Sequence, residues 1–124
     1  MASTINIVST LLFLCFISQG YGLLCSFNDI SIKQSQTGAK IKGKPEWFVS
    51  ITNKCDCVQV NVKLNCQGFQ TVQKIDPSIL MVLGNDECLL NFGNALYNDP
   101  ITFKYAWDKP FPLNPVSSEL DCYR

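Results

Sequence analysis

The sequence predicts an all-β fold, a small antiparallel β-sandwich or partly closed barrel that is stapled by disulfides. Three observations predict it. Apolar and polar residues alternate with a period of two in short segments, turn-forming residues separate these segments, and six cysteines follow an apolar N-terminal run. No amphipathic helix of ordinary length fits between the turn signals, and Ser78–Leu83 is the only helix-compatible stretch, of one or two turns.

Residues 1–22 are interpreted as a signal peptide. The apolar run over residues 5–17 is followed by Gly20-Tyr21-Gly22, a pattern of small residues that suits cleavage before Leu23. The segment carries no Lys or Arg, so a membrane anchor is the alternative, but the run is shorter than the roughly 20 apolar residues that a transmembrane helix needs. We therefore expect a secreted mature chain, residues 23–124, that folds as one cysteine-rich domain and has no membrane partner after cleavage.

The cysteines of the mature chain are expected to form three disulfides, because their number is even and the compartment is oxidising. They are Cys25, Cys55, Cys57, Cys66, Cys88 and Cys122. One residue separates Cys55 from Cys57, so these two do not pair comfortably with each other, and the other connectivities stay open. A thiolate metal site is the alternative, which the lack of histidine and of any Cys-x-x-Cys pair disfavours. We expect no metal and no other cofactor.

Five segments are predicted to be strands from their alternation or their β-forming residues. They are Asp29–Gln34, Trp47–Thr52, Val58–Cys66, Phe69–Lys74 and Ile101–Trp107. In residues 58–66 the alternation places every valine on the buried face and the intervening polar residues in solvent. The same argument assigns Trp47, Tyr105 and Trp107 to the core.

The charge balance and the residue types argue against several functions. Ten basic residues balance ten acidic ones, all beyond residue 22, so no net charge draws the chain to nucleic acid or to anionic membranes. The absence of histidine removes the usual general base and the usual activator of Ser or Cys nucleophiles. The carboxylates are scattered beside turns rather than paired. We therefore expect a protein that is not an enzyme and has no catalytic residue.

Two sets of residues are candidates for contact with a partner. Lys40, Lys42 and Lys44 lie in a Gly38–Lys44 segment that matches a phosphate-binding loop through its lysine, but the next position is Pro45 where Ser or Thr is required. The segment is thus interpreted as an exposed basic hairpin loop, the kind of place where partner contacts concentrate. Near other turns, Tyr97 and Phe111 are candidate exposed aromatics, which could contact a sugar.

The mature chain also resembles a known family over nearly its whole length. The residues that carry the resemblance are Cys25, Gln34, Thr37-Gly38, Gly43, Pro45-Glu46-Trp47, Asn53, Cys55, Cys57, Cys66-x-Gly68-Phe69, Asp76-Pro77, Cys88-Leu89-x-Asn91-x-Gly93, Phe103-x-Tyr105-Ala106-Trp107-Asp108 and Cys122. This pattern resembles the tapetum determinant family, small secreted cysteine-rich proteins of plants. Compared with the founding member, Cys25 follows the signal almost at once, as in a shorter branch of the family.

The resemblance implies a signalling function. The founding member is an extracellular ligand of a leucine-rich-repeat receptor kinase and specifies cell fate in the anther, so this chain is expected to be an apoplastic ligand for such an ectodomain in reproductive development. A compact convex ligand suits the curved face of a repeat solenoid. The alternative is a carbohydrate-binding or cell-wall structural module that binds polysaccharide, which a row of exposed aromatic side chains would favour.

Overall fold

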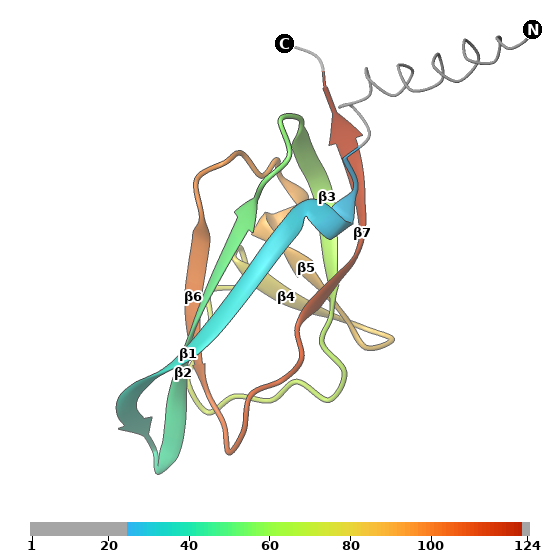
Figure 1. Ribbon diagram of the computed structural model, residues 1–124. Helices are drawn as coiled ribbons and strands as arrows, with labels where there is room; N and C mark the ends of the chain where they lie inside the picture. The colour runs from blue at the N-terminus through green and yellow to red at the C-terminus, as the bar shows by residue number, and fades with distance from the viewer. Residues whose placement is uncertain (1–24, 123–124) are drawn as a thin grey trace, which may run out of the picture.

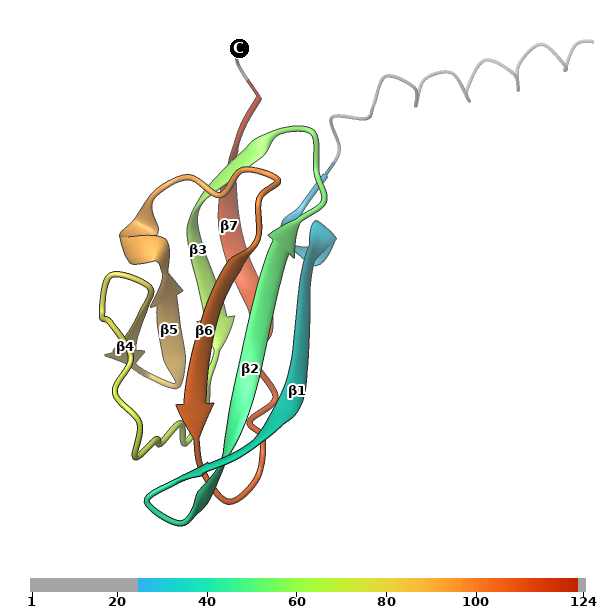
Figure 2. The same cartoon turned by 90° about the vertical axis from the view of Figure 1, so that its left-hand side faces the viewer.

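Alternating apolar positions build two antiparallel sheets that pack face to face. The computed structural model describes residues 25–122. The strands in that range are β1 (Ile30–Ile41), β2 (Lys44–Asn53), β3 (Val58–Asn65), β4 (Leu80–Gly84), β5 (Glu87–Leu90), β6 (Ile101–Ala106) and β7 (Asn114–Asp121), with the short 3-10 turns η2 (Phe27–Asp29) and η3 (Asn91–Gly93). One sheet has the order β1-β2-β6 and the other β4-β5-β3-β7 (Figures 1 and 2). The all-β prediction is confirmed, and the fold is a sandwich rather than a barrel, because neither sheet closes on itself.

The core lies between the two sheets. Val49 and Ile51 of β2, Val62 and Leu64 of β3, and Tyr105 of β6 are all within 1% of complete burial. Trp47 and Trp107, which the alternation assigns to the core, are half-buried and pack against its edge. At 20–33 cal/mol per Å² of apolar surface, burial on this scale is the main term that favours folding.

A two-residue turn joins β1 to β2. Lys42 and Gly43 both have positive φ, 51° and 83°, as the central residues of a type I′ turn do, and this turn matches the twist of the strands that it joins. Between Gln36 and Lys40 the register of β1 against β2 shifts, so Thr37–Ala39 form a bulge opposite Glu46. The long hairpin extends beyond the body of the sandwich (Figure 1).

The alternation in β3 reverses at a bulge, which corrects the prediction for its first half. The pairing of β3 with β7 shifts after Val60, where Asn61 adopts a φ of 50°. As a result the side chain of Gln59 is fully buried, whereas Val58 and Val60 are only half-buried. From Val62 onward the inward residues are those that the sequence predicts. A bulge inserts one residue and so exchanges the two faces of the strand.

Two segments between β3 and β5 differ from the prediction. Phe69–Lys74 is not a strand: Val72 N donates to Ala106 O (3.0 Å) and Ala106 N donates to Thr71 Oγ1 (3.0 Å), so the segment lies along the end of β6 without forming a ladder. The helix-compatible stretch Ser78–Leu83 instead contributes most of β4, which pairs with β5. Tertiary pairing overrides the local helix preference of Leu and Met here.

Three disulfides form, as predicted, and the structure gives their connectivity. They are Cys25–Cys55, Cys57–Cys122 and Cys66–Cys88, with sequence separations of 30, 65 and 22 residues. The first two join the β2–β3 corner to both ends of the described chain, and the third joins the end of β3 to β5. Each should stabilise the fold by about 3–4 kcal/mol, because it restricts the unfolded chain. The predicted signal peptide and its cleavage site lie outside the described residues.

Candidate functional site

The tip of the β1–β2 hairpin carries the three predicted lysines but separates them into two groups. Lys40 and Lys42 are exposed, and Lys42 occupies the turn itself. Lys44 contacts the residues that follow β6: its Nζ lies 2.9 Å from Asp108 Oδ1 and 5.0 Å from the centre of the Trp107 ring. The tip therefore offers two solvated cations on a turn that the third lysine anchors to the neighbouring strand.

A buried carboxylate fixes the base of the same hairpin. Glu46 is 6% exposed, and it accepts a hydrogen bond from Thr37 Oγ1 (2.7 Å) in the bulge and another from Gln73 Nε2 (2.8 Å). These two hydrogen bonds lower the pKa of Glu46, burial opposes the shift, and the charge of Lys104 adds to it. The ionised side chain thus connects the bulge, β2 and the segment beside β6, which makes the hairpin base rigid.

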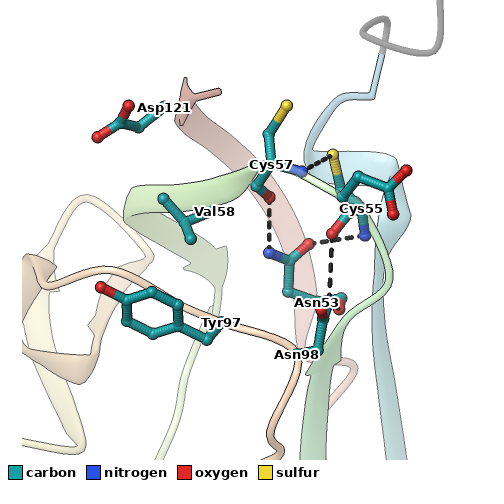
Figure 3. Close-up of a pocket in the computed structure, with 8 residues that line it drawn as sticks. Asn53, Cys55, Cys57, Val58, Tyr97, Asn98 and Asp121 are labelled. Carbon is teal, nitrogen blue, oxygen red and sulfur yellow. Dashed lines mark hydrogen bonds between the residues drawn. The ribbon is translucent and has the colours of Figure 1, made fainter. Parts of the chain in front are cut away.

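Tyr97 lies at the opposite end of the sandwich and borders a pocket of about 310 Å³ (Figure 3). Tyr97 as a whole residue is 64% exposed, whereas the pocket wall is formed by the Cys55-Asp56-Cys57 corner, Val58 and Asp121. The corner is covalently fixed, because Cys55 and Cys57 belong to different disulfides. The pocket combines one aromatic face with carboxylates and backbone groups, a combination that suits a polar ligand with an apolar face.

Asn53 holds the wall of this pocket in place. Its buried Nδ2 donates to Cys57 O (3.0 Å) and Leu96 O (2.9 Å), and its Oδ1 accepts from Cys55 N (3.0 Å) and Gln59 Nε2 (3.1 Å). The amide therefore makes four hydrogen bonds, the most that it can form. It replaces a regular β-turn at the point where the chain leaves one sheet for the other.

Phe111 is not an exposed aromatic, which corrects the prediction. Its ring packs against the rings of Phe69 (centroids 5.1 Å apart) and Tyr105 (5.9 Å) and is half-buried. Tyr105 Oη accepts from Phe111 N (3.0 Å) and donates to Gln34 Oε1 (2.6 Å). Burial raises the pKa of Tyr105, so its hydroxyl keeps the proton that it donates. Phe111 thus lies in the β6–β7 connection with its ring packed against the core.

Buried polar residues are the site features that the sequence reasoning did not identify. Glu46, Asn53 and Gln59 are nearly inaccessible, and although Glu46 and Asn53 belong to the pattern of the family, the burial of none of the three was predicted. The sequence pattern could have predicted the burial of Asn53, because every second residue of β2 from Val49 through Ile51 to Asn53 points into the core. It could not have predicted the burial of Gln59, since that depends on the bulge that follows it.

Two kinds of feature are absent from the part of the chain that the structure describes. No group of three His, Cys, Asp or Glu side chains in residues 25–122 is arranged to hold a metal ion. The same residues contain no helix that is long and apolar enough to cross a membrane.

The fold and the cross-links define a class: a small disulfide-stapled β-sandwich protein. Residues 26–122 match the family model described as "Tapetum determinant 1, C-terminal". The chain therefore belongs to the tapetum determinant family. No solved structure matches it significantly.

Several curated relatives agree with this assignment. TPD1 protein homolog 1 of Arabidopsis thaliana is 32% identical over 102 residues, which cover 80% of this chain and 56% of the relative. TPD1 protein homolog 1A of Oryza sativa subsp. japonica is 29% identical over 96 residues, or 70% of this chain and 42% of the relative. The chain thus spans about half the length of these two homologues. The uncharacterized protein At1g05835 of Arabidopsis thaliana is 31% identical over 107 residues and is covered over 84% of its length.

Proposed function

We propose that this protein is a secreted signalling ligand that binds the ectodomain of a leucine-rich-repeat receptor kinase in the apoplast and acts in cell-fate specification during anther or reproductive development. The observation that carries the proposal is the family match, which extends over residues 26–122 and so includes all but one of the disulfide cysteines. In this proposal the protein has no catalytic activity. Recognition depends on surfaces that the cross-linked sandwich holds in place.

The hairpin tip is the surface on which we place the receptor contact. Lys40 and Lys42 are exposed beyond the body of the sandwich, and the anchored Lys44 and the buried Glu46 limit the freedom of the strands below them. A rigid, projecting pair of cations loses little entropy on binding and can meet an acidic patch on a concave surface. Complementary charges of this kind mainly raise the association rate and the specificity.

The proposal is tested with oxidised protein of residues 23–124. The protein is presented to a panel of leucine-rich-repeat receptor kinase ectodomains, with insoluble wall polysaccharides in parallel. We expect one or a few ectodomains to retain it, and we expect Lys40→Glu/Lys42→Glu to weaken the retention by roughly tenfold or more. Lys54→Glu is the control for a charge reversal elsewhere on the surface, because Lys54 is exposed just after the opposite end of β2. Retention by polysaccharide alone would refute the ligand hypothesis.

One observation favours the second candidate, a carbohydrate-binding module. The exposed Tyr97 ring borders a polar pocket, and a planar apolar face beside carboxylates is the usual environment of a bound sugar. Tyr97→Ala distinguishes the two candidates in the same panel. Loss of polysaccharide binding in this variant, with ectodomain retention absent, would establish the module instead.

A further inference from the structure

The outer face of the four-stranded sheet is hollowed. The hollow has a volume of about 470 Å³ and lies across β3, β4, β5 and β7, where its lining includes Asn61, Lys63, Leu83, Leu89, Ser117 and Glu119. Leu83 is 43% exposed, and Leu89 is only half-buried. Two leucines surrounded by polar and charged side chains form the arrangement of a protein–protein contact, an apolar centre with a polar rim.

An exposed phenylalanine lies at the border of this hollow. Phe92 is 58% exposed and belongs to η3, whose Gly93 packs so closely that an added Cβ would lie 2.9 Å from Asn61 Oδ1 and 3.8 Å from Leu89 Cδ2. Asn61 and Leu89 both line the hollow. Gly93 therefore packs against two residues of the hollow, and Phe92, its neighbour in the chain, lies at the border of the hollow.

The backbone that presents Phe92 is strained. Asn91, Phe92 and Gly93 all have positive φ, 55°, 54° and 81°, a conformation that a bulky side chain rarely adopts. The turn is held by hydrogen bonds from Asn91 N to Ile79 O (2.8 Å) and from Asn91 Nδ2 to Ala95 O (3.1 Å). A large apolar side chain kept in solvent at a conformational cost needs a reason beyond folding, and such strain is typical of contact sites.

This face carries both a cation and an anion, so its charges can complement those of the same face on a second copy. Lys63 and Glu119 both line the hollow, and they do not pair with each other, since the one salt bridge within residues 25–122 joins Lys44 to Asp108. A two-fold axis that passes between these two residues brings the cation of each copy to the anion of the other. The formal net charge of the chain is zero, so two copies do not repel each other at long range.

We propose that this face binds a second copy of the chain. In the resulting two-fold symmetric dimer, Phe92 of each copy contacts the leucines in the hollow of the other. Lys63 pairs with the partner's Glu119, and the contact is repeated by symmetry. The apolar contacts remove exposed Phe92 and Leu83 from water, and the two charge pairs fix the relative orientation of the sheets.

The dimer is tested by sedimentation equilibrium and light scattering on oxidised protein of residues 23–124, up to about 1 mM, the upper end of weak but measurable affinities. We expect a monomer–dimer equilibrium. Phe92→Ala and Lys63→Glu should each raise the dimer dissociation constant by roughly tenfold or more. Lys63→Glu/Glu119→Lys exchanges the two charges and should restore dimerisation. Tyr97→Ala removes a similarly exposed aromatic side chain elsewhere and should leave the dimer intact.

The folding of each variant is checked by circular dichroism and thermal melting. Phe92→Gly is included because glycine relieves the positive φ, so it should lose the dimer while the monomer gains stability. A chain that stays monomeric throughout the range, a dimer that neither single change weakens, or a charge exchange without rescue would each overturn the proposal. The measurement needs no receptor, so its result is independent of the proposed signalling function.

Discussion

At the scale of single residues, buried polar side chains position the surfaces on which function is proposed. Glu46 fixes the hairpin base, whereas Asn53 and Gln59 fix the cysteine corner at the other end of the sandwich. Each group has hydrogen-bond partners, so burial does not leave it unsatisfied. Replacing one of them with an apolar residue would leave its former partners unpaired, which costs more than the lost hydrogen bond itself.

Glu46 makes the stability of the hairpin depend on pH. Its pKa in the folded protein lies below the ordinary value of a glutamate, so the folded state favours the ionised form more than the unfolded state does. This contribution is complete above the unfolded pKa and is lost as the pH falls through the folded one. We expect the midpoint of urea unfolding to fall from about pH 5 downward, and to fall less steeply in Glu46→Gln.

The control for this prediction is Glu87→Gln, the same chemical change at the start of β5. Urea unfolding curves from pH 7 to about pH 3 are compared for the three proteins. Glu46→Gln should be less stable than the wild type at pH 7, and Glu87→Gln shows the effect of the same substitution away from the hairpin base. Identical pH profiles in wild type and Glu46→Gln would contradict the assigned role of Glu46.

At the scale of elements, one of the two central residues of the β1–β2 turn, Lys42, is not of a type that prefers the backbone conformation of this turn. Lys42 and Gly43 both have positive φ, but only glycine adopts this conformation without cost. Nothing lies within 4 Å of a Cβ added to Gly43, so Gly43→Ala should destabilise the protein only through its backbone, by about 1 kcal/mol. Lys42→Asn creates the preferred Asn-Gly turn and should stabilise it by up to about 1 kcal/mol.

Chemical denaturation measures the free energy of unfolding of the two turn variants. We expect it to fall in Gly43→Ala and to rise in Lys42→Asn. Their slopes with denaturant should equal that of the wild type, because neither change alters the buried surface. A stable Gly43→Ala variant would mean that the turn adopts a different conformation in solution. Receptor binding of Lys42→Asn then reports whether the charge of Lys42, rather than the shape of the turn, is recognised.

The elements also show what the sequence could and could not predict. Strands with uninterrupted alternation, such as residues 101–106, were predicted almost to their ends because side-chain period and burial coincide. The face of Gln59 could not be predicted, since it depends on pairing with β7 across a bulge. Nor could β7 itself, whose Pro115 and mostly exposed side chains give no two-residue period. β4 was missed because its pairing with β5 outweighs local preference.

The features of the candidate site likewise divide into those that the local sequence predicts and those that depend on long-range contacts. The basic hairpin and the exposure of Tyr97 followed from turn chemistry, which acts locally. Local reasoning failed for Phe111, because long-range contacts with Phe69 and Tyr105 decide its burial. It also missed Phe92, whose exposure depends on a left-handed turn that closes over Asn61 and Leu89.

At the scale of the whole molecule, three cross-links hold together a chain whose core is modest. The core cluster consists mainly of aliphatic side chains together with Cys66, Cys88, Phe103 and Tyr105. A domain of this size has a net stability of only about 5–15 kcal/mol. The loss of one disulfide, about 3–4 kcal/mol, is therefore a large share of the total.

The Cys66–Cys88 bridge is the cross-link whose removal we expect to prevent secretion. Both cysteines lie in the core, at 3% and 0% exposure, so Cys66→Ala/Cys88→Ala loses buried sulfur contacts in addition to the restriction of a 22-residue separation. Together these losses should reach about 4–6 kcal/mol, near the whole stability of the domain. Expression in plant cells, with protein measured in the medium and in the cell extract, should show the variant retained, whereas Lys42→Glu is exported at the wild-type level. Export of the cysteine variant at that level would mean that β3 and β5 stay paired without this bridge.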